Sequence, residues 1–217
     1  MPKKRDHIPA NIDELEKTFY GPNKDGENVD LARLKRYLDY SRTKVTSPAL
    51  EDDAKEFFAP LGILEKIPEN PNQTTFDYKM DSHKILLDVT SLNMDETSPK
   101  RLSKEETLTK ISTAINHILV KDGSQFLGYR KGAVIVYSLI FNFFSGFNRL
   151  LDGNFPKMAG LFDNDLDFVV FFHEPASVND TSSWERYPPV IYVKRSSMLE
   201  VFKQAFCDCN YRIIPVY

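Results

Sequence analysis

The segment TTFDYKMDSHKILLDVTSLN, Thr74–Asn93, decides the expected fold. Two strand-like runs flank a polar turn, and each run carries one aspartate among apolar residues, Asp77 and Asp88. Apolar side chains in the second run alternate onto both faces, which is typical of a strand covered on both sides. Burial of even a neutral polar group there costs on the order of 2–7 kcal/mol unless a partner compensates it. A metal ion or a neighbouring lysine or arginine would serve as that partner.

The register between the two runs decides whether the aspartates lie together. A two-residue turn at Ser82–His83 places Asp77 directly opposite Asp88, whereas a three-residue turn sends the first aspartate to the other face. Thr90 shares the face of Asp88 in either case, because strand side chains repeat every two residues. The turn residues alone leave both registers open.

The remaining pattern predicts helices and strands around this hairpin. Segments with apolar residues at helical spacing alternate with short apolar runs. This pattern is typical of an α/β domain with a central mixed sheet flanked by helices. We expect this domain over residues 47–217, preceded by an N-terminal helical extension over residues 1–46. The expected elements are a helix beginning at Ser47-Pro48, a helix at Thr107–Leu119 capped by Ser103, and strands at Ala133–Tyr137, Leu166–Phe172 and Val190–Val193.

Composition limits the cellular setting. The net charge is −3, so no global basic field draws the chain to nucleic acid, although local patches remain compatible with it. The basic start, MPKKRDH, has no apolar run behind it, and no apolar run reaches the roughly 20 residues that span a bilayer. Cys207 and Cys209 are interpreted as free thiols in a reducing compartment. We therefore expect a cytoplasmic protein without a membrane anchor.

The order of these elements resembles the PD-(D/E)XK nuclease superfamily, which has the restriction-endonuclease-like fold. Phe76-Asp77 matches the Pro-Asp element of that family, and Asp88-Val89-Thr90 matches its D/E-x-K element. Glu51, with Glu56 as the second choice, stands where the family often has a helix acid. The resemblance covers about 48–172.

This resemblance implies a metal-dependent nuclease acting on DNA. Asp77, Asp88 and Glu51 would hold Mg²⁺, or alternatively Mn²⁺, because hard cations prefer oxygen ligands. The metal would stabilise charge on the scissile phosphate and lower the pKa of the attacking water. Asp77, Asp88, Thr90 and Lys79 are the expected catalytic residues. A homodimer is compatible with symmetric cleavage of a duplex.

The sequence departs from the family pattern at two positions. Phe76 replaces the proline, and Thr90 replaces the lysine, whose positive charge a hydroxyl group cannot supply. Lys79 lies on the face of Asp77, and Lys84 or Lys121 are further candidates for a displaced lysine. The alternative is a catalytically impaired nuclease fold that binds DNA or a partner protein.

Other interpretations of the same residues stay open. Asp88 would be structural if it ended a strand or paired with Lys79, and Glu51 would be structural as a first-turn acid meeting the helix dipole. Asp165 and Asp167, ahead of a strongly apolar strand, resemble the paired aspartates of nucleotidyltransferases. A residue that begins a strand is the simpler interpretation of Asp167.

Overall fold

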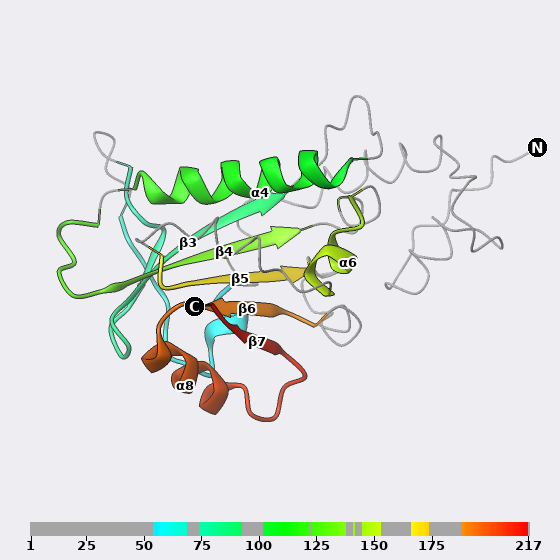
Figure 1. Cartoon of the computed structure of the whole chain (residues 1–217). Helices are drawn as coiled ribbons and strands as arrows, with labels where there is room; N and C mark the ends of the chain where they lie inside the picture. The colour runs from blue at the N-terminus through cyan, green and yellow to red at the C-terminus, as the bar shows by residue number, and fades with distance from the viewer. Residues whose placement is uncertain are drawn as a thin grey trace, which may run out of the picture.

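The structure is a computed structural model that describes residues 54–68, 74–92, 102–121, 123–137, 141, 145–152, 166–173 and 188–216. Across these residues the chain forms a seven-stranded mixed sheet with helices on both faces (Figure 1). The predicted α/β class with a central mixed sheet is confirmed. The expected helical extension, 1–46, lies outside the described residues, and so does the start of the helix expected from Ser47-Pro48.

The strands lie side by side in the order in which they occur along the chain. Strands β1, β2 and β3 are antiparallel neighbours, whereas β3, β4 and β5 are parallel. Strand β6 is antiparallel to β5, and β7 is parallel to β6. Their bounds are Glu65–Lys66 for β1, Tyr78–Met80 for β2, Ile85–Leu92 for β3, Arg130–Tyr137 for β4, Phe168–His173 for β5, Val190–Val193 for β6 and Arg212–Pro215 for β7.

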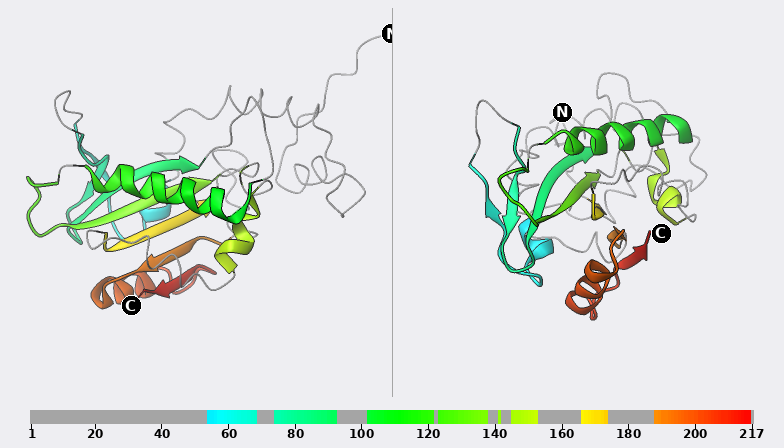
Figure 2. Two further views of the ribbon diagram at one scale, coloured as in Figure 1. Left: turned by 45° about the horizontal axis from the view of Figure 1, so that its top comes forward. Right: turned by 60° about the vertical axis from the view of Figure 1, so that its left-hand side comes forward.

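The helices α4 (Lys104–Leu119), α6 (Phe147–Asp152) and α8 (Ser196–Ala205) cover the sheet, together with a short helical segment at 54–58. Buried residues of α4 and α6 share one apolar cluster, whereas those of 54–58 and α8 share the other. Figure 2 shows α4 and α8 on opposite sides of the sheet. The described part of the chain therefore has three layers, and β3 is covered on both faces as its sequence predicts.

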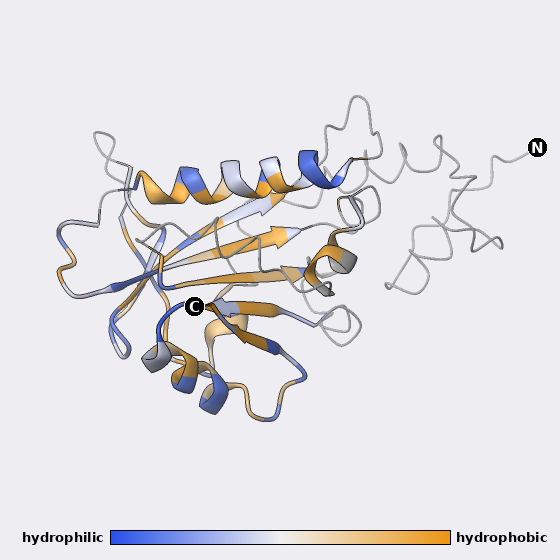
Figure 3. Cartoon of the chain, viewed as in Figure 1, coloured by the Kyte–Doolittle hydropathy of each residue, from blue (hydrophilic) through white to orange (hydrophobic). Residues whose placement is uncertain are grey.

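Helix α4 begins where its capping residue predicts. The Ser103 side chain accepts the Glu106 N–H, and the Glu106 carboxylate accepts the Ser103 N–H, so each satisfies one backbone donor of the first turn. Its apolar side, which includes Ile111, Ile115 and Ile118, faces the sheet (Figure 3). This packing fixes the helix above β3 and β4, and thereby also positions the residues just beyond its C-terminal end.

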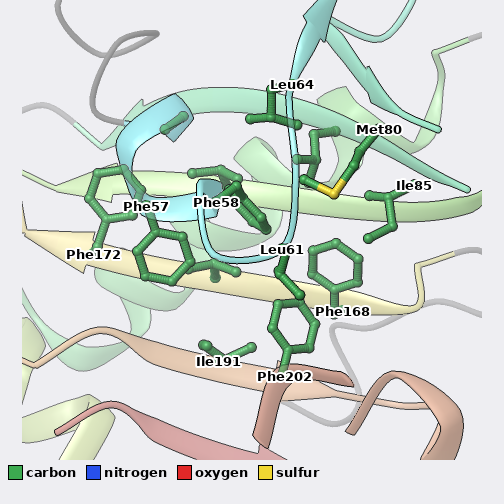
Figure 4. Packing of buried hydrophobic residues seen from close by; sticks show 14 of the residues in the cluster. Phe57, Phe58, Leu61, Leu64, Met80, Ile85, Phe168, Phe172, Ile191 and Phe202 are labelled. Atoms are coloured by element: carbon green, nitrogen blue, oxygen red, sulfur yellow. The ribbon is translucent and has the colours of Figure 1, made fainter. Parts of the chain in front are cut away.

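The opposite face of the sheet is held by aromatic side chains. Phe57 stacks on Phe172, and Phe202 meets Phe168 edge to face at a ring separation of 5.0 Å (Figure 4). The Phe168 ring lies against Gly132 of β4 so closely that a Cβ on that glycine would be 2.1 Å from the ring Cζ. This packing holds β4 and β5 in register at the centre of the sheet.

Candidate functional site

The β2–β3 hairpin adopts the register that brings the two aspartates together. Tyr78 lies opposite Leu87 and Met80 opposite Ile85, which continues to Asp77 opposite Asp88. The Lys84 N–H donates to the Asp81 carbonyl at 3.3 Å, closing a turn with two central residues. Of the two registers open from the sequence, the two-residue turn is therefore the one formed.

Hydrogen bonds to both the side chain and the backbone of Asp77 hold this residue at the beginning of the hairpin. Its Oδ2 accepts the Val89 N–H at 2.9 Å, and its backbone carbonyl accepts the Ile67 N–H at 2.9 Å. The Asp77 side chain is 33% exposed, whereas that of Asp88 is 2% exposed. The Asp77 carboxylate is therefore accessible to solvent, whereas the neighbouring Asp88 carboxylate is buried.

Lys121 completes the cluster from the far end of α4. Its Nζ donates to Asp88 Oδ1 and lies 3.4 Å from Asp77 Oδ1, and its side chain is 12% exposed. The Lys121 N–H donates to the Ile118 carbonyl, so the residue continues the last turn of the packed helix. One ammonium group thus contacts both carboxylates, and we name Asp77, Asp88 and Lys121 the acidic–lysine cluster.

Burial and charge set the protonation of this cluster. Burial, and secondarily the negative charge of Asp77, raise the pKa of Asp88 to about 7, although the hydrogen bond from Lys121 opposes the rise. Burial lowers the pKa of Lys121, but its hydrogen bond to Asp88 and the two carboxylate charges outweigh this effect and raise it overall. With all three groups ionised, the cluster carries one net negative charge, which favours an additional cation.

Thr90 and Lys79 are not brought into this cluster in the same way. Thr90 follows Asp88 by two positions on β3, pairs across the sheet with Ile135, and is half-buried. The Lys79 ammonium instead pairs with Glu65 at 3.0 Å and Asp81 at 2.8 Å, and the hydrogen bond to Asp81 is the main cause that raises its pKa. Among the lysines considered from the sequence, the structure brings Lys121 to the aspartates.

Of the two residues considered as the helix acid, the structure describes one. Glu51 lies outside the described residues, and the second choice, Glu56, is exposed on the short helix at 54–58 that covers the other face. In the part of the chain that the structure describes, no three His, Cys, Asp or Glu side chains gather to hold a metal. Two carboxylates nevertheless suit Mg²⁺, which often takes one or two protein ligands and completes its shell with water and phosphate oxygens.

The ion pair and hydrogen bonds of Asp167 are those of a residue that supports the sheet. Its Oδ1 pairs with Arg195 Nε at 2.6 Å, its Oδ2 accepts the Lys131 N–H at 2.9 Å, and its side chain is 8% exposed. Its backbone also bonds Lys131 and Lys194, so this residue links the ends of β4 and β6. Asp165 lies outside the described residues. Cys207 and Cys209 are free cysteines, in agreement with their interpretation from the sequence, and both are exposed.

No protein-family model, no curated protein and no solved structure matches the chain. Within the described ranges, no helix has the length and apolarity needed to cross a membrane. The geometry of the acidic–lysine cluster is therefore the basis for a functional proposal.

Proposed function

We propose that the chain is a metal-dependent deoxyribonuclease with a restriction-endonuclease-like fold, whose hydrolytic site is the acidic–lysine cluster. The single observation that carries this proposal is the Lys121 ammonium group, which contacts the carboxylates of both Asp77 and Asp88. A buried carboxylate without a metal or a cation would be costly, and sites of catalysis are where such arrangements concentrate. The order β2, turn, β3, α4 and parallel β4 also agrees with the order on which the sequence resemblance rests.

Each residue of the cluster has a role in this proposal. Asp77 and Asp88 would hold Mg²⁺ or Mn²⁺, which supplies charge stabilisation at the phosphate and a more acidic bound water. Asp88 provides a fixed oxygen from the rigid sheet, whereas Asp77 provides one that is open to solvent. Lys121 supplies the positive charge that Thr90 lacks and is positioned to hold a water or a phosphate oxygen beside the carboxylates.

The test is cleavage of supercoiled plasmid with Mg²⁺ or Mn²⁺. Wild type is expected to cut, whereas Asp77→Asn, Asp88→Asn and Lys121→Met are each expected to lose at least about 100-fold in rate, on the scale of losing one charge-stabilising group. Asp208→Asn, the same change on an exposed loop, is the matched control and should cut like wild type. Wild-type rates in all three cluster variants would contradict the proposal.

A second candidate function is a nuclease fold that binds DNA or a partner without cleaving it. The observation that favours it is again Lys121, because an ammonium group bonded to both Oδ1 atoms already neutralises part of the charge that a metal would meet. This function is distinguished by salt-sensitive DNA binding with no cleavage under either metal.

A further inference from the structure

One edge of the sheet gathers cationic residues from three separate segments of the chain. Lys84 immediately precedes β3, Arg130 and Lys131 begin β4, and Lys194 and Arg195 immediately follow β6. Because β6 runs antiparallel to β5, its C-terminal end lies at the same edge as the N-terminal ends of β3 and β4. We name these five residues the basic edge.

Backbone hydrogen bonds align the strand ends that carry the basic edge. The Arg130 N–H donates to the Lys84 carbonyl at 2.7 Å, and the Lys194 N–H donates to the Asp167 carbonyl at 2.9 Å. The Asp167 N–H donates in turn to the Lys131 carbonyl at 2.8 Å. Neighbouring strands lie about 4.8 Å apart, so the edge from β3 to β6 is about 14 Å long.

Within the described residues, a carboxylate neutralises part of the charge of the basic edge. Asp167 pairs with Arg195, whose side chain remains 63% exposed. Across the described residues, no carboxylate forms an ion pair with Lys84, Arg130 or Lys131. Helix α8 begins beside Arg195 without an acidic residue in its first turn, so its dipole adds to the positive charge. This local field contrasts with the net charge of −3 for the whole chain.

The basic edge continues onto the face that carries the acidic–lysine cluster. Lys131 lies opposite Leu86 in the sheet, two residues before Asp88 on the same face, which corresponds to about 7 Å along the strand. A Cβ added to Gly123 would meet Leu86, Phe76 and Lys131 at 3.2 to 3.5 Å, so the Lys131 side chain lies over that face. In Figure 1 the β2–β3 turn, the segment before β4 and the start of α8 all lie toward the left-hand end of the strands.

We propose that the basic edge binds the phosphate backbone of double-stranded DNA and directs it across the acidic–lysine cluster. This inference rests on the proposed function and names the surface that would deliver its substrate. One DNA strand presents a phosphate about every 3.4 Å along the helix axis, so a row of cations about 14 Å long spans about four phosphates. Phosphate contacts of this kind position the duplex without reading its sequence.

The test compares binding of a labelled DNA duplex by the full chain in metal-free buffer over a range of salt concentrations. The edge variant Lys84→Asn/Arg130→Gln removes two charges. Asparagine is chosen because Lys84 has φ +50, a conformation that asparagine tolerates well. The matched control is Lys104→Gln/Lys203→Gln, which removes two charges from exposed positions on α4 and α8. Thermal unfolding checks that both variants are folded, and Lys84→Asn alone provides a milder second variant.

The edge variant is expected to bind on the order of 10-fold more weakly, with its salt dependence reduced by about one unit of slope per charge removed, whereas the control binds like wild type. Equal binding by the edge variant and wild type overturns the basic edge while leaving the nuclease proposal intact. Edge-dependent binding without cleavage supports the basic edge and contradicts the nuclease. Tighter binding of a matched RNA duplex, or no binding of DNA by wild type, overturns the basic edge.

Discussion

At the scale of single residues, Asp88 is unfavourable for folding and informative for function. It is a buried carboxylate in the middle of a strand, and one lysine from a distant segment bonds it. Ion pairs buried in this way contribute little net stability, because desolvation offsets much of their attraction. The small net stability expected of this pair agrees with the functional role that we propose for it.

Removal of the lysine alone is expected to destabilise the protein. Lys121→Met leaves Asp88 buried without its cation, which raises the pKa of Asp88 further and lowers the free energy of unfolding by about 3 kcal/mol. Urea denaturation at neutral pH measures this loss. Lys104→Met, at an exposed position of the same helix, is the control and should change stability by less than about 0.5 kcal/mol. A loss no larger than that of the control would show that the pair is not buried as described.

The raised pKa of Asp88 makes stability depend on pH in a defined direction. Its folded pKa of about 7 lies above the ordinary aspartate value of 3.8, so the folded state binds the proton more tightly. The contribution is fully present below pH 3.8 and is lost as pH rises toward 7, with a slope no steeper than about 1.4 kcal/mol per pH unit. Urea denaturation of wild type and Asp88→Asn between about pH 5 and 8 isolates this contribution, because only wild type should show it. Parallel pH profiles would contradict the assignment.

The sequence predicts part of this site and leaves part of it open for a physical reason. The side-chain alternation of strands limits Asp77 and Asp88 to two relative positions, and a short turn selects one of them. The choice among Lys79, Lys84 and Lys121 depends instead on where a helix ends in space. Lys79 shares the face of Asp77, but its ammonium group pairs with Glu65 and Asp81 instead. The alternation of side chains along a strand does not predict which of several carboxylates a lysine will bind.

At the scale of secondary-structure elements, the length of α4 explains why Lys121 reaches the site. Its 16 residues rise about 24 Å, which nearly equals the roughly 26 Å spanned by the eight residues of β3. A helix that leaves the end of β3 and runs back over it therefore ends near the beginning of that strand. The capped start at Ser103 and the amphipathic pattern were sufficient to predict the helix, and this length comparison would have favoured Lys121.

The bounds of the other elements agree with the sequence patterns to different degrees. Strand β6 has the predicted bounds, whereas β4 begins at Arg130, three residues before the predicted strand, because polar residues at its start still pair in the sheet. Helix α8 was not predicted, although Met198, Phe202 and Phe206 recur every four residues and all are buried. Strand β7 is harder to predict, because it is a short edge strand with half-buried residues.

The contact between β4 and β5 provides a prediction at this scale. Gly132→Ala places a methyl group 2.1 to 2.7 Å from three atoms of the Phe168 ring, so the ring must move within a packed aromatic cluster. We expect a loss of about 3 kcal/mol in the free energy of unfolding, at the upper end for overpacking. Urea denaturation measures this loss.

A double-mutant cycle tests the cause of that loss. Phe168→Leu removes the ring, so Gly132→Ala should cost less in the Phe168→Leu background than in wild type, with a coupling free energy of about 1 kcal/mol or more. Additive effects would mean that the clash with Phe168 is not what makes glycine necessary at this position.

At the scale of the whole molecule, the fold and the site use different parts of the structure. Two apolar clusters, one on each face of the sheet, hold the layers together, and Asp167 links the ends of β4, β5 and β6. The side chains of the acidic–lysine cluster are not what pairs the strands, because β2 and β3 already pair through their backbones. Stability and activity should therefore be separable by substitution.

The sharpest separation comes from replacing the buried pair as a unit. Asp88→Leu/Lys121→Met removes both charges and substitutes apolar side chains of similar size, a change that in comparable cases is neutral or stabilises by about 1–4 kcal/mol. We expect the double variant to unfold at the same or a higher urea concentration than wild type, although Lys121→Met alone is destabilised. Plasmid cleavage with Mg²⁺ or Mn²⁺ should nevertheless be lost, whereas Asp208→Asn retains both properties. A double variant less stable than Lys121→Met would assign the pair to the architecture of the sheet, and cleavage by a stable double variant would place the chemistry elsewhere.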